Sequence, residues 1–286
     1  MKKLLILSGK GGTGKTTTAA AFIRLAQAKA IADCDVDAPN LHLVLSQTSQ
    51  PQKKDFFGGD KAVIDAEKCV GCGLCAQYCR FEALESCEDT YRVRETACEG
   101  CGVCARVCPQ SAVTLQPDVA GAEMLYQGET VFSTAKLKMG RGNSGKLVTN
   151  VKLAMLKNAP ECDLAIIDGS PGIGCPVIAS VSGMDLVLVV AEPSLSGISD
   201  LKRLVKTAET FQTRLAVCVN KWDMSPENTA AIESYCREEG ILFLGKIPYD
   251  KTAALAVNEG KSIVSFDCPA KDAIIEIFEQ TKKLLM

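Results

Sequence analysis

A glycine-rich loop near the amino terminus constrains this chain more than any other feature. Residues 3–7 form an apolar run, residues 9–17 read GKGGTGKTT, and an alanine-rich helical pattern continues to about residue 29. This order matches the motif G-x-x-x-x-G-K-[ST], in which backbone N–H groups and the amino end of the helix surround phosphate oxygens. A chance glycine-rich turn would lack the flanking strand and helix. The sequence therefore predicts a nucleotide phosphate site.

The side chains of this loop are expected to have separate tasks. Lys15 would reach the β- and γ-phosphates, and the Thr16 hydroxyl would bind Mg²⁺. Lys10 is a second lysine that the general motif does not require, and a solvated loop lysine is the alternative interpretation. The motif predicts these nucleotide contacts: Gly9, Gly11, Gly12, Thr13, Gly14, Thr16 and Thr17.

Apolar runs alternate with helical patterns along the rest of the chain. The runs that indicate further strands are residues 29–33, 164–168, 185–190, 215–220 and 242–245. The helical patterns cover residues 146–158, 197–211, 226–239 and 252–259, and an amphipathic helix is expected over 267–285. Apolar strands that alternate with helices predict a three-layer α/β domain with a mainly parallel sheet and helices on both faces.

Polar residues follow three of these apolar runs, where the strands of a parallel sheet end. Because such ends face the ligand crevice, Asp33 and Asp35 are expected there, although a surface acidic turn remains an alternative. Asp168 ends the run LAIID and is expected to hold Mg²⁺ through water. The run AVCVNKWD provides Asn220 and Asp223 in the pattern N-K-x-D, which predicts contacts to the nucleotide base. These residues do not distinguish adenine from guanine on physical grounds.

The second strong feature is a cysteine pattern that occurs twice, at residues 69–79 and 98–108. Each copy reads C-x2-C-x2-C-x3-C, the spacing in which three thiolates bind one [4Fe–4S] cluster and the fourth binds the other. A zinc site is the alternative, but zinc favours two separated C-x2-C pairs. The pattern assigns one cluster to Cys69, Cys72, Cys75 and Cys108, and the second to Cys98, Cys101, Cys104 and Cys79.

The cysteine repeat predicts a domain of its own. Residues 60–118 carry the repeat, short strand-like pieces and more acids than bases, and they resemble a bacterial ferredoxin of α+β type with two clusters. Residues 46–60 look like an entry linker, and the exit is expected near residues 116–121. We therefore expect a discontinuous nucleotide-binding domain, residues 1–59 and 119–286, with an inserted domain at 60–118.

Composition limits the compartment and the partners. The chain has 286 residues, fifteen cysteines and a formal net charge of −2. No signal peptide and no stretch of about 18 apolar residues is visible, so a cytoplasmic protein without stable membrane insertion is expected. In that reducing compartment the clustered cysteines are interpreted as metal ligands rather than disulfides. No basic face indicates nucleic acid as a partner.

The loop with its extra lysine, KGGTGKTT, resembles the deviant Walker A ATPases of the MinD/ParA/Mrp type. The segments DCDVDAPNLHL, SGKL, DGSPGIGCPVIAS and AEPSLSG support the resemblance over most of the chain. The resemblance implies ATP as the nucleotide, with Asn220 at adenine, Asp35 at the attacking water and Asp33 near Mg²⁺. It also implies an ATP-bound homodimer or paralogue heterodimer in which Lys10 acts across the interface. Some relatives hold a bridging cluster with cysteine pairs, so a role for Cys175 as a transient ligand or thiol stays open.

These observations predict a P-loop ATPase that uses ATP, Mg²⁺ and two [4Fe–4S] clusters. The first hypothesis is a nucleotide-switched dimer coupled to electron transfer with a redox donor or acceptor protein, in the service of a metallocofactor pathway. The alternative is an Mrp-like ATPase that assembles or delivers iron–sulfur or other metal cofactors. A positioning ATPase is disfavoured, because membrane targeting of that type needs a basic amphipathic helix after the core. The acidic insert favours a basic docking face on the redox partner.

Overall fold

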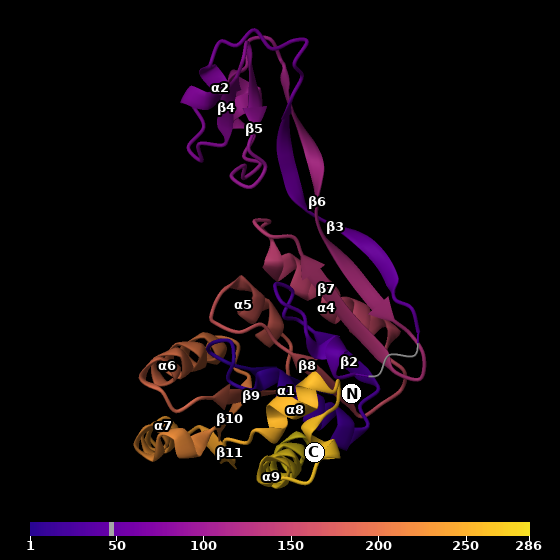
Figure 1. The fold of residues 1–286 in the computed structure, drawn as a ribbon, viewed down its shortest axis with the longest axis vertical. Coiled ribbons are helices and arrows are strands. Elements are labelled where there is room, and N and C mark those ends of the chain that lie inside the picture. The colour runs from indigo at the N-terminus through magenta and orange to yellow at the C-terminus, as the bar shows by residue number, and fades with distance from the viewer. Residues whose placement is uncertain (46–48) are drawn as a thin grey trace. The chain divides into compact units, whose positions relative to one another are not determined.

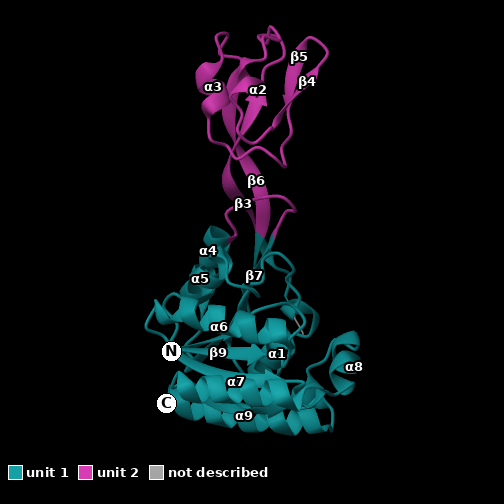
Figure 2. Ribbon diagram, turned by 90° about the vertical axis from the view of Figure 1, so that its left-hand side faces the viewer, with its two compact units in different colours: residues 1–53, 123–136, 145–286 teal, residues 54–122, 137–144 magenta. Residues whose placement is uncertain are grey.

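The computed structural model describes residues 1–45 and 49–286, and these residues form two compact units. Unit 1 comprises residues 1–53, 123–136 and 145–286, and unit 2 comprises residues 54–122 and 137–144 (Figure 2). The chain thus leaves unit 1 and returns to it twice.

The described part of unit 1 contains a parallel sheet (Figure 1). Its strands are β1 (Lys2–Leu7), β2 (Ala30–Asp33), β7 (Val131–Leu137), β8 (Leu164–Asp168), β9 (Leu186–Ala191), β10 (Arg214–Asn220) and β11 (Leu242–Ile247). They neighbour one another in the order β11-β10-β9-β1-β8-β2-β7, and each of these pairs is parallel. The order continues through β6 (Val113–Tyr126) and β3 (Gln52–Ile64), whose residues are divided between the two units. β1, the strand before the phosphate loop, therefore lies inside the sheet.

Helices cover both faces of this sheet. The helices of unit 1 are α1 (Lys15–Ala26), α4 (Ser144–Asn158), α5 (Cys175–Val181), α6 (Leu195–Glu209), α7 (Pro226–Glu238), α8 (Thr252–Asn258) and α9 (Pro269–Leu285), with the 3-10 turns Leu41–Leu43, Trp222–Met224 and Ile263–Ser265. α1 and α9 pack together on one face, where the rings of Phe22 and Phe278 meet edge to face with centroids 5.1 Å apart. α5, α6 and α7 pack in series and contact β1, β9 and β10 respectively. The three-layer α/β fold with a mainly parallel sheet is confirmed.

Unit 2 contains only short helices among its described residues. They are α2 (Leu74–Gln77) and α3 (Val103–Val107), and β4 (Leu84–Cys87) pairs antiparallel with β5 (Thr90–Val93). The buried core of this unit is small and rich in cysteine, because Cys75, Cys98 and Cys104 pack with Ala62, Ala83 and Val113. A core of this kind leaves few apolar side chains to stabilise the unit by burial alone.

The structure differs from the sequence analysis at the edges of the insert. Residues 52–60, expected as a linker, belong to β3, while residues 46–48 of that linker lie outside the described residues. The expected exit at 116–121 lies inside β6. Most side chains of β3 are exposed, so polar residues are tolerated on both faces and the strand carries no alternating pattern. The compact unit also starts earlier and ends later than 60–118 and includes residues 137–144.

Candidate functional site

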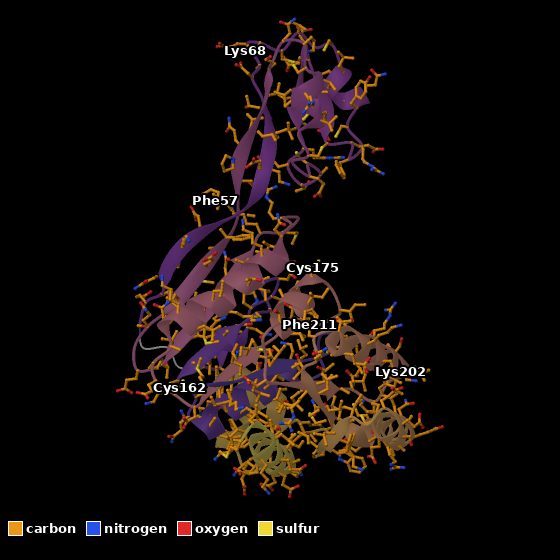
Figure 3. All side chains as sticks on the ribbon, turned by 180° about the vertical axis from the view of Figure 1, so that it is seen from behind. Phe57, Lys68, Cys162, Cys175, Lys202 and Phe211 are labelled. Carbon is orange, nitrogen blue, oxygen red and sulfur yellow. The ribbon has the colours of Figure 1, made fainter. Side chains whose placement is uncertain are left out.

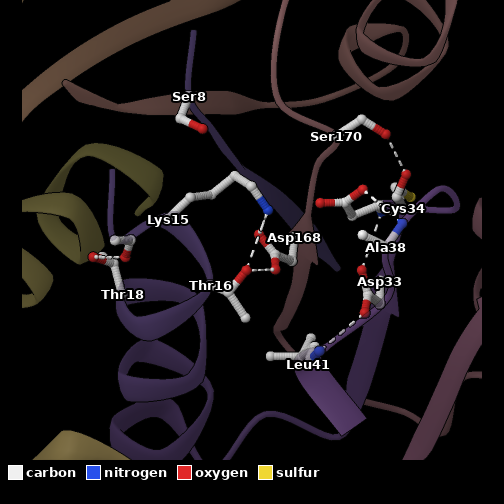
Figure 4. A network of polar contacts seen from close by, with 12 residues as sticks. Ser8, Lys15, Thr16, Thr18, Asp33, Cys34, Ala38, Leu41, Asp168 and Ser170 are labelled. Carbon is white, nitrogen blue, oxygen red and sulfur yellow. Dashed lines mark hydrogen bonds and ion pairs between the residues drawn. The ribbon is translucent and has the colours of Figure 1, made fainter. Parts of the chain in front are cut away.

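The candidate nucleotide site lies at the carboxyl ends of β1, β8 and β2. Asp168 ends β8 and is in register with Ile6 of β1 on one side and with Asp33 of β2 on the other. The glycine-rich loop leaves β1 and α1 begins at Lys15, where the left-handed backbone of Gly14 (φ 93°) makes the turn. The parallel sheet therefore brings the loop lysine and both acids to one edge (Figure 4).

Lys15, Thr16 and Asp168 form one hydrogen-bonded group. Lys15 Nζ lies 2.6 Å from Asp168 Oδ1, and the Thr16 hydroxyl donates to Asp168 Oδ2 at 2.8 Å. Both ends of the ion pair are buried. Burial lowers the pKa of Lys15, but the adjacent Asp168 carboxylate outweighs this effect and the pKa is raised overall. Lys15 is therefore a fixed positive charge at the start of α1, where an anion is also favoured by the helix dipole.

Asp33 and Asp35 lie beside this group, as the sequence analysis expected. Asp33 is fully buried and accepts hydrogen bonds from the backbone N–H groups of Asp35 and Leu41, each at 3.1 Å. Burial and the neighbouring Asp168 carboxylate raise the pKa of Asp33 to about 7. Asp35 is mostly buried, accepts from the N–H of Ala38 at 3.4 Å, and has its pKa raised by burial. The two acids are thus organised by backbone groups, and a divalent cation bound beside their carboxyl oxygens would favour the ionised forms that burial disfavours.

Lys10 has partners outside the glycine-rich loop. Its Nζ donates to the hydroxyls of Ser194 and Ser196 at 3.0 and 3.1 Å and lies 3.7 Å from a Glu192 carboxylate oxygen. Ser194 also caps α6 by accepting from the N–H of Gly197. The Lys10 side chain is about one-third exposed. Lys10 is therefore held by the segment between β9 and α6, so a freely solvated lysine is not what the structure shows.

Asn220 lies against the glycine-rich loop, and Asp223 does not. The Asn220 amide donates from Nδ2 to the carbonyl of Thr13 at 2.8 Å, and its Oδ1 accepts from the N–H of Lys221. With Gly12, Gly14, Thr17 and residues 247–251, Asn220 lines a cavity of about 420 Å³, a size that suits a small ligand. Asp223 instead accepts from the backbone N–H of Tyr249 at 2.7 Å and is not among the residues that line this cavity.

The segment after Asp168 is tied to both neighbouring strands. The Ser170 hydroxyl donates to the carbonyl of Cys34 at 2.5 Å, and the N–H of Gly172 donates to the carbonyl of Ser8 at 3.0 Å. This segment leads into α5, whose first residue is Cys175, an exposed thiol (Figure 3). The described residues thus place Cys175 at the surface, two residues after the exposed Ile173.

Lys152 fixes the other end of α5, and the sequence analysis missed it. Its ammonium group donates to the carbonyls of Ala179, Ser180 and Ser182 at 2.7, 2.8 and 2.7 Å, although only 7% of the residue is exposed. Burial lowers its pKa to about 8. The sequence does contain a signal for this role, because Lys152 stands on the apolar face of α4 with Val151 and Met155. A basic residue on that face has to find acceptors inside the protein.

In unit 2 the eight cysteines of the repeat line two separate cavities. Cavity 1 is lined by Cys69, Cys72, Cys75 and Cys108 together with Ile64, Val70, Gly73, Tyr91, Gln110, Ala112 and Val113. Cavity 2 is lined by Cys79, Cys98, Cys101 and Cys104 together with Ala62, Phe81, Ala83, Leu84, Glu99, Gly100, Gly102, Val103 and Leu115. The structure therefore brings together the same two sets of four thiols that the spacing predicts, with the last cysteine of each copy in the other cavity.

Equivalent backbone features surround the two cavities. Gly71 and Gly100, one repeat apart, both have φ of 64°, a region that favours glycine. A side chain at either position would also strike a backbone carbonyl, that of Asp89 or of Asp60. The last cysteine of each copy accepts a backbone N–H at 3.3 Å, Cys79 from Ala83 and Cys108 from Ala112. The repeat in the sequence is thus a repeat in structure.

Four thiols around a cavity can bind either one metal ion or a cluster. Within residues 1–45 and 49–286, no group of three or more histidine, cysteine or acidic side chains lies close enough to hold a single ion. A four-iron cluster is different, because each thiolate binds a different iron and the sulfurs stand around a cage. Four thiols around each cavity meet the ligand number of a [4Fe–4S] cluster, and the fourth cysteine of each copy lines the other cavity, as the two-cluster pattern requires and as separate zinc sites do not.

The fold and the nucleotide site define a P-loop nucleotide-binding protein of three-layer α/β type. The chain belongs to the CobQ/CobB/MinD/ParA nucleotide binding domain family, whose sequence model matches residues 4–263. In the described part of the chain, no helix has both the length and the apolar character required to cross a membrane.

Individual relatives lie at low identity. An uncharacterized protein of Methanocaldococcus jannaschii is 28% identical over 99% of this chain and 97% of its own length. A protein of Pyrococcus horikoshii named iron-sulfur cluster carrier protein is 26% identical over 97% of this chain and 84% of its own length.

Two solved structures share the fold. The cell division ATPase MinD of Pyrococcus furiosus superposes with a TM-score of 0.58 at 17% identity, covering 99% of both chains. The septum site-determining protein MinD of Pyrococcus horikoshii, complexed with Mg-ADP, gives 0.59 at 18% identity, covering 99% of this chain and 96% of its own. At these identities the likeness concerns the fold.

Proposed function

We propose that this protein is an ATPase that carries two resident [4Fe–4S] clusters in unit 2 and couples a nucleotide-switched dimer to electron transfer. The observation that carries the proposal is the sorting of eight thiols into two cavities, each lined by four. When bound, the clusters would accept and donate single electrons. This arrangement and the small, cysteine-rich core of unit 2 support a ferredoxin-like role for that unit.

The residues of unit 1 support ATP hydrolysis in assigned roles. Lys15 remains cationic because its pKa is raised, and it would neutralise charge on the β- and γ-phosphates. Thr16 and Asp168, already hydrogen-bonded to each other, would hold Mg²⁺ with Asp33 nearby. Asp35 would orient the attacking water. The glycine-rich loop would supply backbone N–H groups, and Asn220 would contact adenine from the wall of the adjoining cavity.

Lys10 is the residue that we assign to the dimer. Ser194, Ser196 and Glu192 hold its ammonium group at the segment before α6, and about one-third of the side chain is exposed. A lysine in that position can exchange these partners for a phosphate bound to a second subunit. Such a charge, supplied in trans, would stabilise the transition state as an arginine finger does. The second subunit would be another copy of this chain or a paralogue.

The first test is anaerobic purification with iron, acid-labile sulfide and zinc analysis, followed by EPR of the reduced protein with and without Mg·ATP. We expect about eight irons per chain and a spectrum or potential that changes with ATP. Near-zero iron with bound zinc would refute the cluster assignment. Eight irons without any response to ATP would refute the coupling.

The roles of the two lysines are tested separately. Lys10→Ala and Lys15→Ala should each abolish ATP hydrolysis while the iron content stays at the wild-type value. Lys157→Ala, an exposed lysine on α4, is the matched control. Light scattering in the presence of a non-hydrolysable ATP analogue should show a dimer for the wild-type protein. Normal hydrolysis by Lys10→Ala would contradict the trans role.

A second candidate is a cluster carrier, which the name of the Pyrococcus horikoshii relative favours. In that case iron and sulfide would be cargo, and ATP would promote their release to an acceptor. The two functions differ in a measurable way. The holoprotein is incubated with Mg·ATP and an apo acceptor enzyme that requires a [4Fe–4S] cluster, and iron is then counted in both proteins. Retention of about eight irons supports resident redox centres, whereas transfer to the acceptor supports the carrier.

A further inference from the structure

The two cysteine cavities can be compared position by position, because the repeat has a period of 29 residues between Cys69 and Cys98. The ligand positions and their glycines are identical in the two copies, and Ala83 and Ala112 also correspond. Three lining positions differ in chemistry. Cavity 1 has Tyr91, Gln110 and Val70 where cavity 2 has Ala62, Phe81 and Glu99.

Two of these differences add hydrogen-bond donors to cavity 1. Tyr91 lines cavity 1, and its hydroxyl lies 3.1 Å from the point where a Cβ on Gly73, another lining residue, would stand. Among the described residues, no hydrogen bond uses this hydroxyl or the side-chain amide of Gln110. At the equivalent positions cavity 2 has a methyl group and a phenyl ring, neither of which donates a hydrogen bond to sulfur.

The third difference is the negative charge of Glu99, which the positive charge of Lys61 offsets. Glu99 lines cavity 2, and its carboxylate would disfavour additional negative charge there. Lys61, however, donates from its ammonium group to the carbonyl of Cys98, a residue of the same cavity. These opposite charges offset each other, and Glu99 is exposed and screened by solvent. The contrast between the cavities therefore rests mainly on the donors of Tyr91 and Gln110.

We propose that Tyr91 and Gln110 make cavity 1 the site of higher reduction potential, so that the first electron taken up by the protein resides there. This inference rests on the proposed function, namely that each cavity holds a [4Fe–4S] cluster. Hydrogen bonds to cluster and ligand sulfurs stabilise the reduced, more negative form and raise its potential. The first electron from an external one-electron reductant would enter the cluster held at cavity 1, and the second would enter the cluster held at cavity 2. No bond breaks in either step.

The experiment is a reductive titration of the anaerobically purified holoprotein with dithionite, followed by EPR at controlled potentials. The wild-type protein should show two one-electron steps. Tyr91→Phe keeps the ring and removes the hydroxyl, so it should lower the upper step and leave the lower step in place. Phe81→Gln adds an amide donor to cavity 2 and should raise the potential of the lower step. The difference in potential between the two steps should therefore become smaller in this variant as well. Both variants are compared at equal iron content.

The outcomes separate this inference from the proposed function. A wild-type protein with far fewer than eight irons overturns the proposed function and with it the inference. Eight irons with an unchanged upper step in Tyr91→Phe, or with a shift of the lower step instead, overturns the inference alone. If Tyr91→Phe loses iron, Gln110→Leu replaces it with the same expected fall of the upper step. No shift in Gln110→Leu would then refute the assignment.

Discussion

Removal of the Lys152 ammonium group should destabilise unit 1 by about 1–3 kcal/mol, because the loss of three hydrogen bonds outweighs the relief of burying a charged group. In Lys152→Met the apolar stem of the side chain is kept, and three hydrogen bonds to the end of α5 are lost. One of these bonds is fully buried, and a buried acceptor left without a donor costs about 1–3 kcal/mol. The other two are partly buried, so water can replace part of each bond, and about 0.5–1.5 kcal/mol each is expected.

The assay is urea unfolding followed by circular dichroism, with Lys157→Met on the same helix as the exposed control. A surface substitution of that kind should change stability by less than about 0.5 kcal/mol. If Lys152→Met is no less stable than Lys157→Met, the three bonds do not hold α5 and the reasoning is wrong.

The same lysine predicts a pH dependence with a definite sign. Burial lowers the pKa of Lys152 to about 8 in the folded protein, while the unfolded chain has the ordinary value of 10.5. Between these values the unfolded chain binds more protons, so the contribution of Lys152 to stability rises with pH, by at most about 1.4 kcal/mol per pH unit. The difference in stability between the wild-type protein and Lys152→Met should therefore grow from pH 8 to pH 10. If the difference in stability stays constant between pH 8 and pH 10, the pKa of Lys152 is not lowered in the folded protein.

Three further substitutions test the two sites. Asn220→Ala removes the bond to the phosphate loop and should weaken binding of a fluorescent ATP analogue about tenfold, corresponding to about 1.4 kcal/mol; unchanged affinity would argue against a base contact. Cys108→Ser should lower the iron content toward about four per chain, whereas Cys87→Ser, outside both cavities, should leave it unchanged. Gly100→Ala places a side chain at positive φ against the Asp60 carbonyl and should destabilise unit 2 by at least about 1–2 kcal/mol in thermal unfolding, while Gly128→Ala, with open space around it, should not.

The central strands and the phosphate loop could be predicted because their sequence signals coincide with burial. The inner residues of β1, β8, β9 and β10 are continuous apolar runs that are almost fully buried, and exposed polar residues such as Lys2 and Arg214 stand only at strand ends. The acids that end β2 and β8 follow from the rule that parallel strands present their carboxyl ends at one edge. The same signals located Asn220, because it ends β10.

Elements without such a signal were missed, or, for β3 and β6, indicated only by short strand-like pieces at 62–65 and 112–115. β7 (VFSTAKL) buries Ser133 and Thr134, so its polar residues hide a buried strand. β3 and β6 are long strands with mostly exposed or half-exposed side chains, and their Lys, Asp and Gly residues resemble loop composition. α5 is short and begins with Cys-Pro, which gives no helical period. The partners of Lys10 lie more than 180 residues away along the chain, and only the fold brings them together.

The exchange of Cys79 and Cys108 between the two cavities makes the repeat indivisible. Each 29-residue copy contains three thiols of one cavity and the fourth of the other, so neither copy encloses a cavity by itself. Loss of one copy would therefore remove thiols from both cavities together. The lining residues, by contrast, already differ between the two copies, as Gln110 and Phe81 do at equivalent positions.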